Sequence, residues 1–380
     1  MHMSEYESAT ADVLNILWGS QPKAPYLERQ FQTCSKIVSL IRSSTVQTTI
    51  DDILKQLYDH FKISTLDDNI PEDVLRQLIF AVIGWSTMLY APAFELAGAD
   101  FPTLTKYGNT HGFNKHSVTR VTDMSRRPIG AILSCRGLIP IACSSGVESY
   151  KGFSTLLSVP HLNFYSLSRL GDVTITWVND LSKHCEFDRY SKKKQLKLFR
   201  LPSLCATICL NQGDEALIGR LFKNHACQQK CQAISDTVAR SYLIGVLLSY
   251  RLIFGQHPLS RRIFREKERE RAKWDGSLDP LLDALCGQEY VNGFDGTEDL
   301  LRERGVYDAH INFPHLGARL MDLADYISTQ KPRNLLEVWK DQRDPEKLLT
   351  FKAVIIIGGL TIALGVLQVF VGIAQIALQR

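Results

Sequence analysis

The sequence predicts an α+β fold, in which a predominantly helical cytosolic body carries a small antiparallel β-sheet and is followed by one C-terminal transmembrane helix. Three observations support this fold. Apolar residues recur at helical spacing before about residue 100 and again after Pro202. Between these parts the chain is rich in Val, Ile, Thr and aromatic residues, with turn residues between the runs. Residues 353–378 contain no charged side chain.

The composition is that of a folded protein in a reducing compartment. Apolar residues make up 45% of the 380 residues and charged residues 22%, which argues against a disordered chain. A net charge of +4 is too small to indicate binding to nucleic acid. No signal-peptide pattern is visible at the N-terminus, and the nine cysteines are an odd number. We therefore expect a cytosolic body with free thiols and no nucleic-acid partner.

The first region, residues 1–100, is predicted to be helical. Tyr26–Ile41 and Val46–Phe61 have apolar residues at helical spacing, and a third helix is expected to begin at Pro71. The stretch Gln77–Phe94 carries no charge. It is either a core helix or a membrane-associated segment, and its Gly, Ser, Thr and Pro residues favour the core helix.

The second region, residues 101–202, is predicted to be β-rich. The segment Val173–Val178 alternates apolar and polar residues, as a strand with one buried face does. Residues 186–200 indicate a hairpin with a basic turn at Lys192–Lys194. The expected strands, which form a small antiparallel sheet, are Ser117–Thr122, Ile129–Ser134, Leu162–Leu167, Val173–Val178 and Leu196–Arg200.

Helices are expected again in the third region, residues 203–328, most clearly at Ile234–Phe254. This region and the two before it either share one core or form separate units. A polar connector, residues 329–350, then leads to the transmembrane helix at residues 353–378.

The 26 charge-free residues Ala353–Leu378 are long enough to cross a bilayer. As a helix they span about 39 Å, against a hydrocarbon core of about 30 Å. Lys and Arg residues gather before this segment, and only Arg380 follows it. The positive-inside rule therefore places the body in the cytosol, in a tail-anchored, single-pass arrangement with membrane lipid as a partner. We favour the endoplasmic reticulum over the mitochondrial outer membrane.

One face of the predicted anchor carries small and amide side chains. They recur at spacings of three and four and include Gly358, Thr361, Gly365, Gln368, Gly372 and Gln375. Small residues let two helices approach closely, and amides can form hydrogen bonds across an apolar interface. The pattern predicts a homo- or hetero-oligomer through this helix. The alternative is that Gly is simply frequent in membrane helices.

Linear signatures of dinucleotide, phosphate, protease or calcium sites are absent, and no cofactor is predicted. A zinc site is conceivable from soft and nitrogen ligands spaced along the chain. The candidates are Cys205, Cys209, His225, Cys227 and Cys231. Their spacing differs from that of common zinc knuckles, and a pair of buried thiols on one helical face is the favoured interpretation.

Two groups of His and Asp residues are candidates for acid–base chemistry. His111 and His116 lie in a predicted Gly- and Asn-containing loop, whereas Asp308, His310 and His315 lie near an expected helix break at Pro314. Surface histidines with ordinary local hydrogen bonds are the favoured interpretation of each group. Convergence of the two groups in space would favour catalysis.

Several stretches resemble a family of functionally uncharacterised filamentous-fungal proteins with a C-terminal membrane anchor. They are Ile83–Tyr90, Ile175–Val178, Phe187–Asp188, Leu198–Ser203, Tyr250–Gln256, Ser260–Arg261 and the anchor itself. The resemblance implies a fungal, membrane-anchored protein, and it supplies neither an activity nor catalytic residues.

Two functional hypotheses follow from the sequence. In the first, the body is an interaction or scaffold module that the terminal helix holds at a membrane. In the second, it is a membrane-tethered enzyme without a recognised motif, acting on a lipophilic small molecule. A deep apolar pocket with converging His, Asp or Cys side chains would favour the enzyme.

Overall fold

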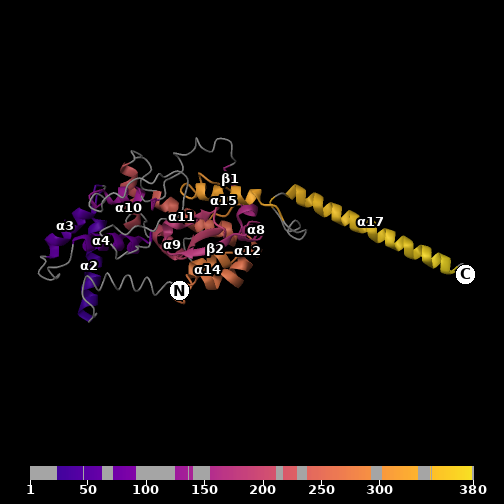
Figure 1. Cartoon of the computed structure of the whole chain (residues 1–380), viewed down its shortest axis with the longest axis horizontal. Coiled ribbons are helices and arrows are strands. Elements are labelled where there is room, and N and C mark those ends of the chain that lie inside the picture. Colours follow the sequence, from indigo (N-terminus) through magenta and orange to yellow (C-terminus); the bar gives the residue numbers. More distant parts are fainter. Residues whose placement is uncertain are drawn as a thin grey trace.

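The computed structural model describes part of the chain in detail. The described residues are 24–45, 47–61, 72–90, 125–135, 137–139, 155–210, 217–228, 238–291, 302–332, 343 and 345–378. Figure 1 shows a lobe of N-terminal helices, a central body, and a long helix that extends alone beyond the body. The expected strand at residues 117–122 lies outside the described residues.

Helices from three separate stretches of sequence build the N-terminal lobe. They are α2 (Ala24–Arg42), α3 (Ile50–Phe61), α4 (Glu72–Thr87), α6 (Ile129–Cys135) and α10 (Leu217–Gln228). A capping box starts α3, since the N–H of Asp52 donates to the Thr49 hydroxyl (3.0 Å) and the N–H of Thr49 donates to the Asp52 carboxylate (2.9 Å). Arg76 of α4 then joins α3 through an ion pair with Asp51 (2.7 Å).

The segment after α4 connects the lobe to the body. Backbone N–H groups of Leu181 and Ser182 donate to the carbonyls of Met88 (2.8 Å) and Leu89 (3.1 Å). Tyr90 is buried, and its hydroxyl donates to the Phe80 carbonyl (2.5 Å). The charge-free part of α4, from Gln77 onwards, therefore lies in the core, which confirms the favoured interpretation for residues 77–90.

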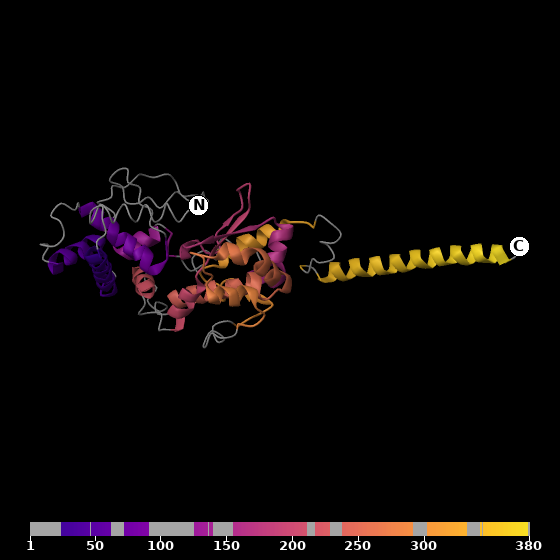
Figure 2. The same cartoon turned by 90° about the horizontal axis from the view of Figure 1, so that it is seen from below.

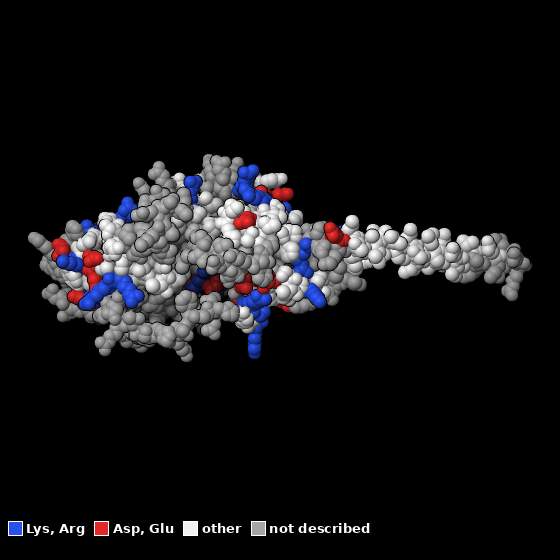
Figure 3. Space-filling model, turned by 90° about the horizontal axis from the view of Figure 1, so that it is seen from above, with Lys and Arg blue, Asp and Glu red and all other residues white. Residues whose placement is uncertain are grey.

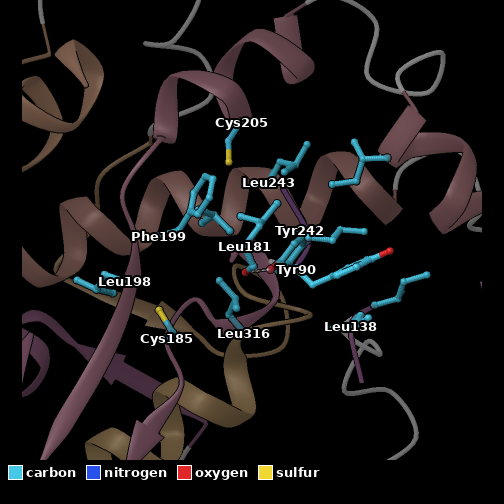
Figure 4. Close-up of a cluster of buried hydrophobic side chains, with 14 of the residues drawn as sticks. Tyr90, Leu138, Leu181, Cys185, Leu198, Phe199, Cys205, Tyr242, Leu243 and Leu316 are labelled. Carbon is cyan, nitrogen blue, oxygen red and sulfur yellow. Dashed lines mark hydrogen bonds between the residues drawn. The ribbon is translucent and has the colours of Figure 1, made fainter. Parts of the chain in front are cut away.

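Tyr90 and Leu138 of the lobe lie in the same buried cluster as side chains of the body (Figure 4). The body contributes Leu181, Cys185, Leu198, Phe199, Cys205, Tyr242, Leu243 and Leu316. One apolar cluster runs from Ile37 to Ile327 among the described residues. The helical and β-containing parts therefore share a single core.

The central sheet has three strands in the order β2–β4–β3, with β2 at Thr174–Val178, β3 at Phe187–Asp188 and β4 at Gln195–Phe199. The predicted hairpin is confirmed, because β3 and β4 are antiparallel. The prediction of a wholly antiparallel sheet is wrong, because β2 and β4 run parallel. The short 3-10 turn η2 (Leu181–Lys183) reverses the chain after β2, so β3 can occupy the far edge while β4 enters between the two strands.

A second, two-stranded sheet joins distant parts of the chain. β1 (Leu156–Ser158) pairs antiparallel with β5 (Val306–Asp308). Leu157 and Tyr307 face the core, while Leu156 and Val306 are exposed. Pairing of this kind fixes the segment around residue 306 to the segment around residue 157.

Two expected strands are helices. Ile129–Ser134 lies in α6, and Leu162–Leu167 spans the end of α7 (Val159–Leu162) and most of α8 (Phe164–Leu170). In the second case local capping decides the outcome. Pro160 lies in the first turn of α7, and the Asn163 side chain accepts a hydrogen bond from Ser166 N–H at the start of α8 (2.9 Å). Once these caps start the helices, a helix buries the apolar and aromatic side chains of this segment as well as a strand would.

The remaining helices surround α11 (Val238–Tyr250), which is buried on nearly every side. The helix predicted at Ile234–Phe254 is therefore confirmed over its described part. It packs against α10, α9 (Pro202–Leu210), the π-helical turn η3 (Arg251–Gly255) and α14 (Pro280–Gly287). The other helical elements of the body are α12 (Pro258–Ile263), the π-helical turn η4 (Phe264–Glu268), α13 (Arg269–Ala272) and α15 (Gly317–Thr329).

The final helix, α17 (Pro345–Leu378), leaves the body alone (Figures 1 and 2). Before it, the Arg343 guanidinium donates to the carbonyls of Ile327 (2.6 Å) and Gln330 (3.0 Å) at the end of α15. This contact satisfies carbonyls that a helix C-terminus leaves without intrahelical partners. The connector before α17 is therefore fixed to the body at Arg343.

Arg251 is a fully buried charge at the centre of the C-terminal helices, with an exposed fraction of 1%. Its guanidinium donates to the carbonyls of Leu285 (3.0 Å), Gln288 (2.8 Å) and Glu289 (2.5 Å), at and beyond the end of α14. It also forms an ion pair with Glu303. Each of the three guanidinium nitrogens of Arg251 thus donates at least one hydrogen bond, as a buried charge requires.

Replacement of Arg251 by Met is expected to lower the free energy of unfolding by about 3–5 kcal/mol, because three carbonyls and one carboxylate lose their donor. Urea unfolding of the full-length protein in mild detergent, followed by circular dichroism, measures this. The matched control is Arg262→Met, which removes an exposed Arg paired with Glu266 at i,i+4. Similar unfolding midpoints for the two variants would contradict the structural role of Arg251.

Candidate functional site

Two helical segments of the described chain are long and apolar enough to cross a membrane. They are Val238–Gly255 and Leu348–Val371. In the first, 78% of the residues are buried inside the protein, whereas in the second none is. The first segment is thus the core helix α11 with its π-helical extension. The second, in α17, is a candidate membrane span.

From Ala353 onwards the surface of α17 carries no charged side chain, and large apolar side chains cover most of it. Large side chains such as Val354, Ile362 and Phe370 are 64%, 70% and 67% exposed. Figure 3 shows no blue or red side chain along most of this helix. Such a surface is unfavourable in water, since each buried CH₂ group is worth about 0.8 kcal/mol on transfer to an apolar environment. The helix therefore requires lipid or another apolar partner.

The small and amide residues of α17 form one stripe along the helix. Nothing lies within 4 Å of a Cβ placed on Gly358 or Gly365, so the backbone there is open to a neighbouring helix. The Thr361 hydroxyl donates to the Ile357 carbonyl (2.9 Å) and is satisfied within the helix. Gln368 and Gln375 are exposed. Their amides are the polar groups of the stripe that an apolar solvent would leave without partners.

Asp308 is a structural residue of the turn that follows β5. Its carboxylate accepts hydrogen bonds from the backbone N–H groups of His310 (2.8 Å) and Ile311 (2.9 Å), and from the Thr155 hydroxyl (3.1 Å). The N–H groups of the turn, Ile311 first, hold the pKa of Asp308 below its usual range. A carboxylate that already accepts three hydrogen bonds is poorly placed to act as a base.

The other predicted acid–base residues do not form a visible cluster. His315 is buried, lies edge-on to Tyr242, and contacts the Ser241 hydroxyl (3.2 Å). Among the described residues no group of three or more His, Cys, Asp or Glu side chains could hold a metal ion. His111 and His116 lie outside the described residues, so their convergence with Asp308, His310 and His315 stays a prediction.

Part of the proposed zinc set can be placed. Cys205 and Cys209 are buried on α9, as expected for thiols on one helical face. Burial raises the pKa of the Cys205 thiol well above its usual value and that of Cys209 to about 11. These thiols therefore stay protonated. His225 and Cys227 belong to α10, but their side chains lie outside the described part of the structure. Cys231 lies outside the described residues altogether.

A buried histidine that the sequence did not indicate lies at the centre of the body. His184 Nδ1 accepts a hydrogen bond from Phe199 N–H (3.1 Å), which leaves the proton on Nε2. Nε2 then donates to the Ser249 hydroxyl (2.7 Å), and that hydroxyl donates to the Val246 carbonyl (2.7 Å). The imidazole cannot accept the serine proton in this arrangement. The pair therefore supports the fold and is not a nucleophile–base pair.

A second Ser–His contact is local. The Ser158 hydroxyl and His161 Nδ1 are 2.5 Å apart, three residues from each other at the start of α7. Ser158 is the N-cap residue of this helix, but its side chain makes no capping hydrogen bond. The Ser158 hydroxyl forms a hydrogen bond with His161 instead of with a backbone N–H group of the helix. Such a contact explains the position of both side chains without a substrate.

The imidazole of His184 makes the stability of the protein depend on pH. Burial, with a further contribution from Arg319, lowers its pKa to about 3 in the folded protein. In the unfolded chain a histidine has a pKa of about 6.5, so the unfolded state binds the proton first as pH falls. The stabilising effect is therefore complete above about pH 6.5 and is lost as pH decreases towards about 3.

Between about pH 7 and pH 5 this linkage is expected to remove about 2 kcal/mol of stability. The decrease is obtained from urea unfolding at the two pH values, and it should be absent in a His184→Gln variant. His310→Gln, which alters a histidine in the turn after β5, should retain the full decrease. Equal losses in the wild type and in His184→Gln would exclude His184 as the source.

Comparisons of the chain with protein-family models, with curated proteins and with solved structures give no match. The functional interpretation therefore depends on the geometry of the chain itself, and its foremost feature is the exposed apolar helix α17.

Proposed function

We propose that this chain is a single-pass membrane protein whose body is an interaction or scaffold module on the cytosolic side. The observation that carries the proposal is the contrast between two apolar helical segments: Val238–Gly255 is mostly buried in the core, whereas Leu348–Val371, the more apolar of the two, has no buried residue. The body buries its apolar side chains in a core and is suited to water, whereas the projecting apolar helix is suited to lipid.

The charge distribution supports a cytosolic body. Arg343, Lys347 and Lys352 precede the apolar part of α17, and only Arg380 follows it. Positive residues near a membrane span stay on the cytosolic side. We propose a tail-anchored arrangement, with the endoplasmic reticulum favoured over the mitochondrial outer membrane.

A binding role fits the polar groups of the body better than catalysis does. Asp308, His184 and His315 are engaged in hydrogen bonds that hold loops and strands in place. The basic helix region α12–α13 is neutralised by ion pairs such as Arg269–Asp283 and Arg271–Glu268. This region therefore presents no open basic surface to nucleic acid, in agreement with the small net charge.

The stripe of α17 supports association between membrane helices. Open backbone at Gly358 and Gly365 allows close approach, and the amides of Gln368 and Gln375 gain from a partner in an apolar solvent. We propose that the chain forms a homo- or hetero-oligomer through this face. The enzyme alternative, acting on a lipophilic molecule, would instead be supported by a small molecule that copurifies with the body.

The topology is tested by adding a short Asn-Gly-Thr glycosylation tag after Arg380 and translating the protein with microsomes. The sequence contains no Asn-x-Ser/Thr site, so any endoglycosidase-sensitive increase in mass reports the tag alone. We expect the C-terminal tag to be glycosylated and a matching N-terminal tag to stay unmodified. The reverse pattern would overturn the orientation, and insertion only into mitochondria would overturn the choice of organelle.

Association through the stripe is tested by copurifying two differently tagged full-length chains from mild detergent and identifying other bound proteins by mass spectrometry. Gly365→Leu is expected to reduce copurification at least fivefold, since a side chain there separates the helices. Gly359→Leu places the same side chain on the opposite face of α17 and is expected to have little effect. Equal effects of the two substitutions would exclude this stripe as the contact.

A further inference from the structure

The turn between β3 and β4 forms a projecting tip with a defined shape. We call residues Asp188–Lys194 the hairpin tip. In Figure 2 the hairpin extends from one side of the body, roughly across the direction in which α17 leaves it. The tip therefore projects beyond the helices of the body.

Hydrogen bonds within the tip fix its backbone. The Asp188 carboxylate accepts from the N–H groups of Tyr190 (3.2 Å) and Ser191 (3.0 Å). The Ser191 hydroxyl donates to the Lys193 carbonyl (2.8 Å), and the Lys194 ammonium donates to the carbonyls of Ser191 (3.0 Å) and Arg189. Asp188 and Lys194 are thus engaged in holding the turn. A rigid turn loses little conformational entropy when it binds a partner.

Arg189 attaches the tip to α15. Its guanidinium forms ion pairs with Asp325 (2.9 Å) and Asp322 (3.4 Å). These two carboxylates are the acidic groups of the adjacent helix, and Arg189 pairs with both of them. Within the described part of the chain, neither carboxylate forms an ion pair with Lys192 or Lys193.

Three side chains remain directed outwards. Tyr190 is 74% exposed, and Lys192 and Lys193 are exposed as well. Neither lysine forms an ion pair within the described part of the chain. The basic region α12–α13 differs, since its arginines are paired with neighbouring carboxylates. In Figure 3 a group of blue side chains extends from the lower edge of the body.

We propose that the hairpin tip is a docking site for an acidic segment of another protein, with Lys192 and Lys193 as the charged contacts and Tyr190 as the aromatic contact. Two ammonium groups without partners attract carboxylates over a distance and increase the association rate. An exposed tyrosine supplies a large contact area at little entropic cost. Because the tip projects to the side of the body, across the direction of α17, a protein beside the body reaches it more directly than lipid headgroups at the anchor do.

The test uses the full-length protein in nanodiscs of neutral phosphatidylcholine and a fluorescein-labelled octaglutamate peptide as the probe. Binding is followed by fluorescence anisotropy at low and at physiological salt. The variant Lys192→Glu with Lys193→Glu is expected to weaken binding at least tenfold. The matched control, Lys55→Glu with Lys267→Glu, makes the same change in net charge at two exposed positions on other surfaces. It is expected to leave binding within about twofold of the wild type, since screening limits the effect of distant charges.

Each result of this experiment decides the proposal. Loss of peptide binding in the tip variant alone supports it, and a steep decrease with salt supports the electrostatic origin. Equal losses in both variants would show that only net charge matters and would overturn it. A tip variant that binds the peptide normally but binds phosphatidylserine nanodiscs less tightly would also overturn it, in favour of lipid. None of these results depends on whether α17 associates with another helix.

Discussion

The buried guanidinium of Arg251 is the contact on which the C-terminal half of the structure depends. It lies in a π-helical turn directly after α11, where an extra residue in the turn alters the direction of the side chains. From there it reaches the last carbonyls of α14 and the Glu303 carboxylate before β5. Gly255, at the end of the same turn, is a glycine because a Cβ would lie 2.4 Å from the guanidinium and 2.5 Å from the Leu285 carbonyl. One charge therefore determines how α11, α14 and the segment leading to β5 fit together.

The same principle, that buried polar groups require partners, explains the rest of the polar interior. Trp177 of β2 donates to the buried Glu268 carboxylate (3.2 Å), and Arg271 approaches the same carboxylate (2.6 Å). His184 accepts a hydrogen bond from Phe199 N–H and donates one to the Ser249 hydroxyl, so both of its ring nitrogens have a partner. Such groups hold elements in register and leave little capacity for chemistry. The proposed contacts with partners therefore lie on the surface, and on α17 in particular.

The burial of apolar side chains changes at Arg343. Before it, the apolar side chains of α11, β4 and α4 are covered by other parts of the protein. After it, Leu348–Val371 of α17 is more apolar than the buried segment Val238–Gly255, yet none of it is buried within the described part of the protein. The hairpin tip is a third kind of surface, polar and rigid, at a distance from the anchor. Together these features are the basis for the proposal of a body that is held at a membrane and contacts neighbouring proteins.

Local signals in the sequence determined a large part of this description. The helical spacing of Val46–Phe61 and Ile234–Phe254, the alternation in Val173–Val178 and the charge-free run 353–378 each correspond to an element of the structure. These signals depend on neighbours within a few residues, so a single sequence contains them. The composition of Ile129–Ser134 and Leu162–Leu167 was misleading, because β-branched and aromatic residues also suit a buried helix.

Only the tertiary structure decided the contacts between distant segments. The parallel pairing of β2 with β4, the pairing of β1 with β5 and the partners of Arg251 and His184 join residues far apart in sequence. No local pattern encodes such a partner, since any buried donor can satisfy any acceptor that packing brings to it. The length of the charge-free run distinguished the exposed helix from the buried ones in the sequence, but which side chains cover α4 and α11 depends on how the rest of the chain packs against them.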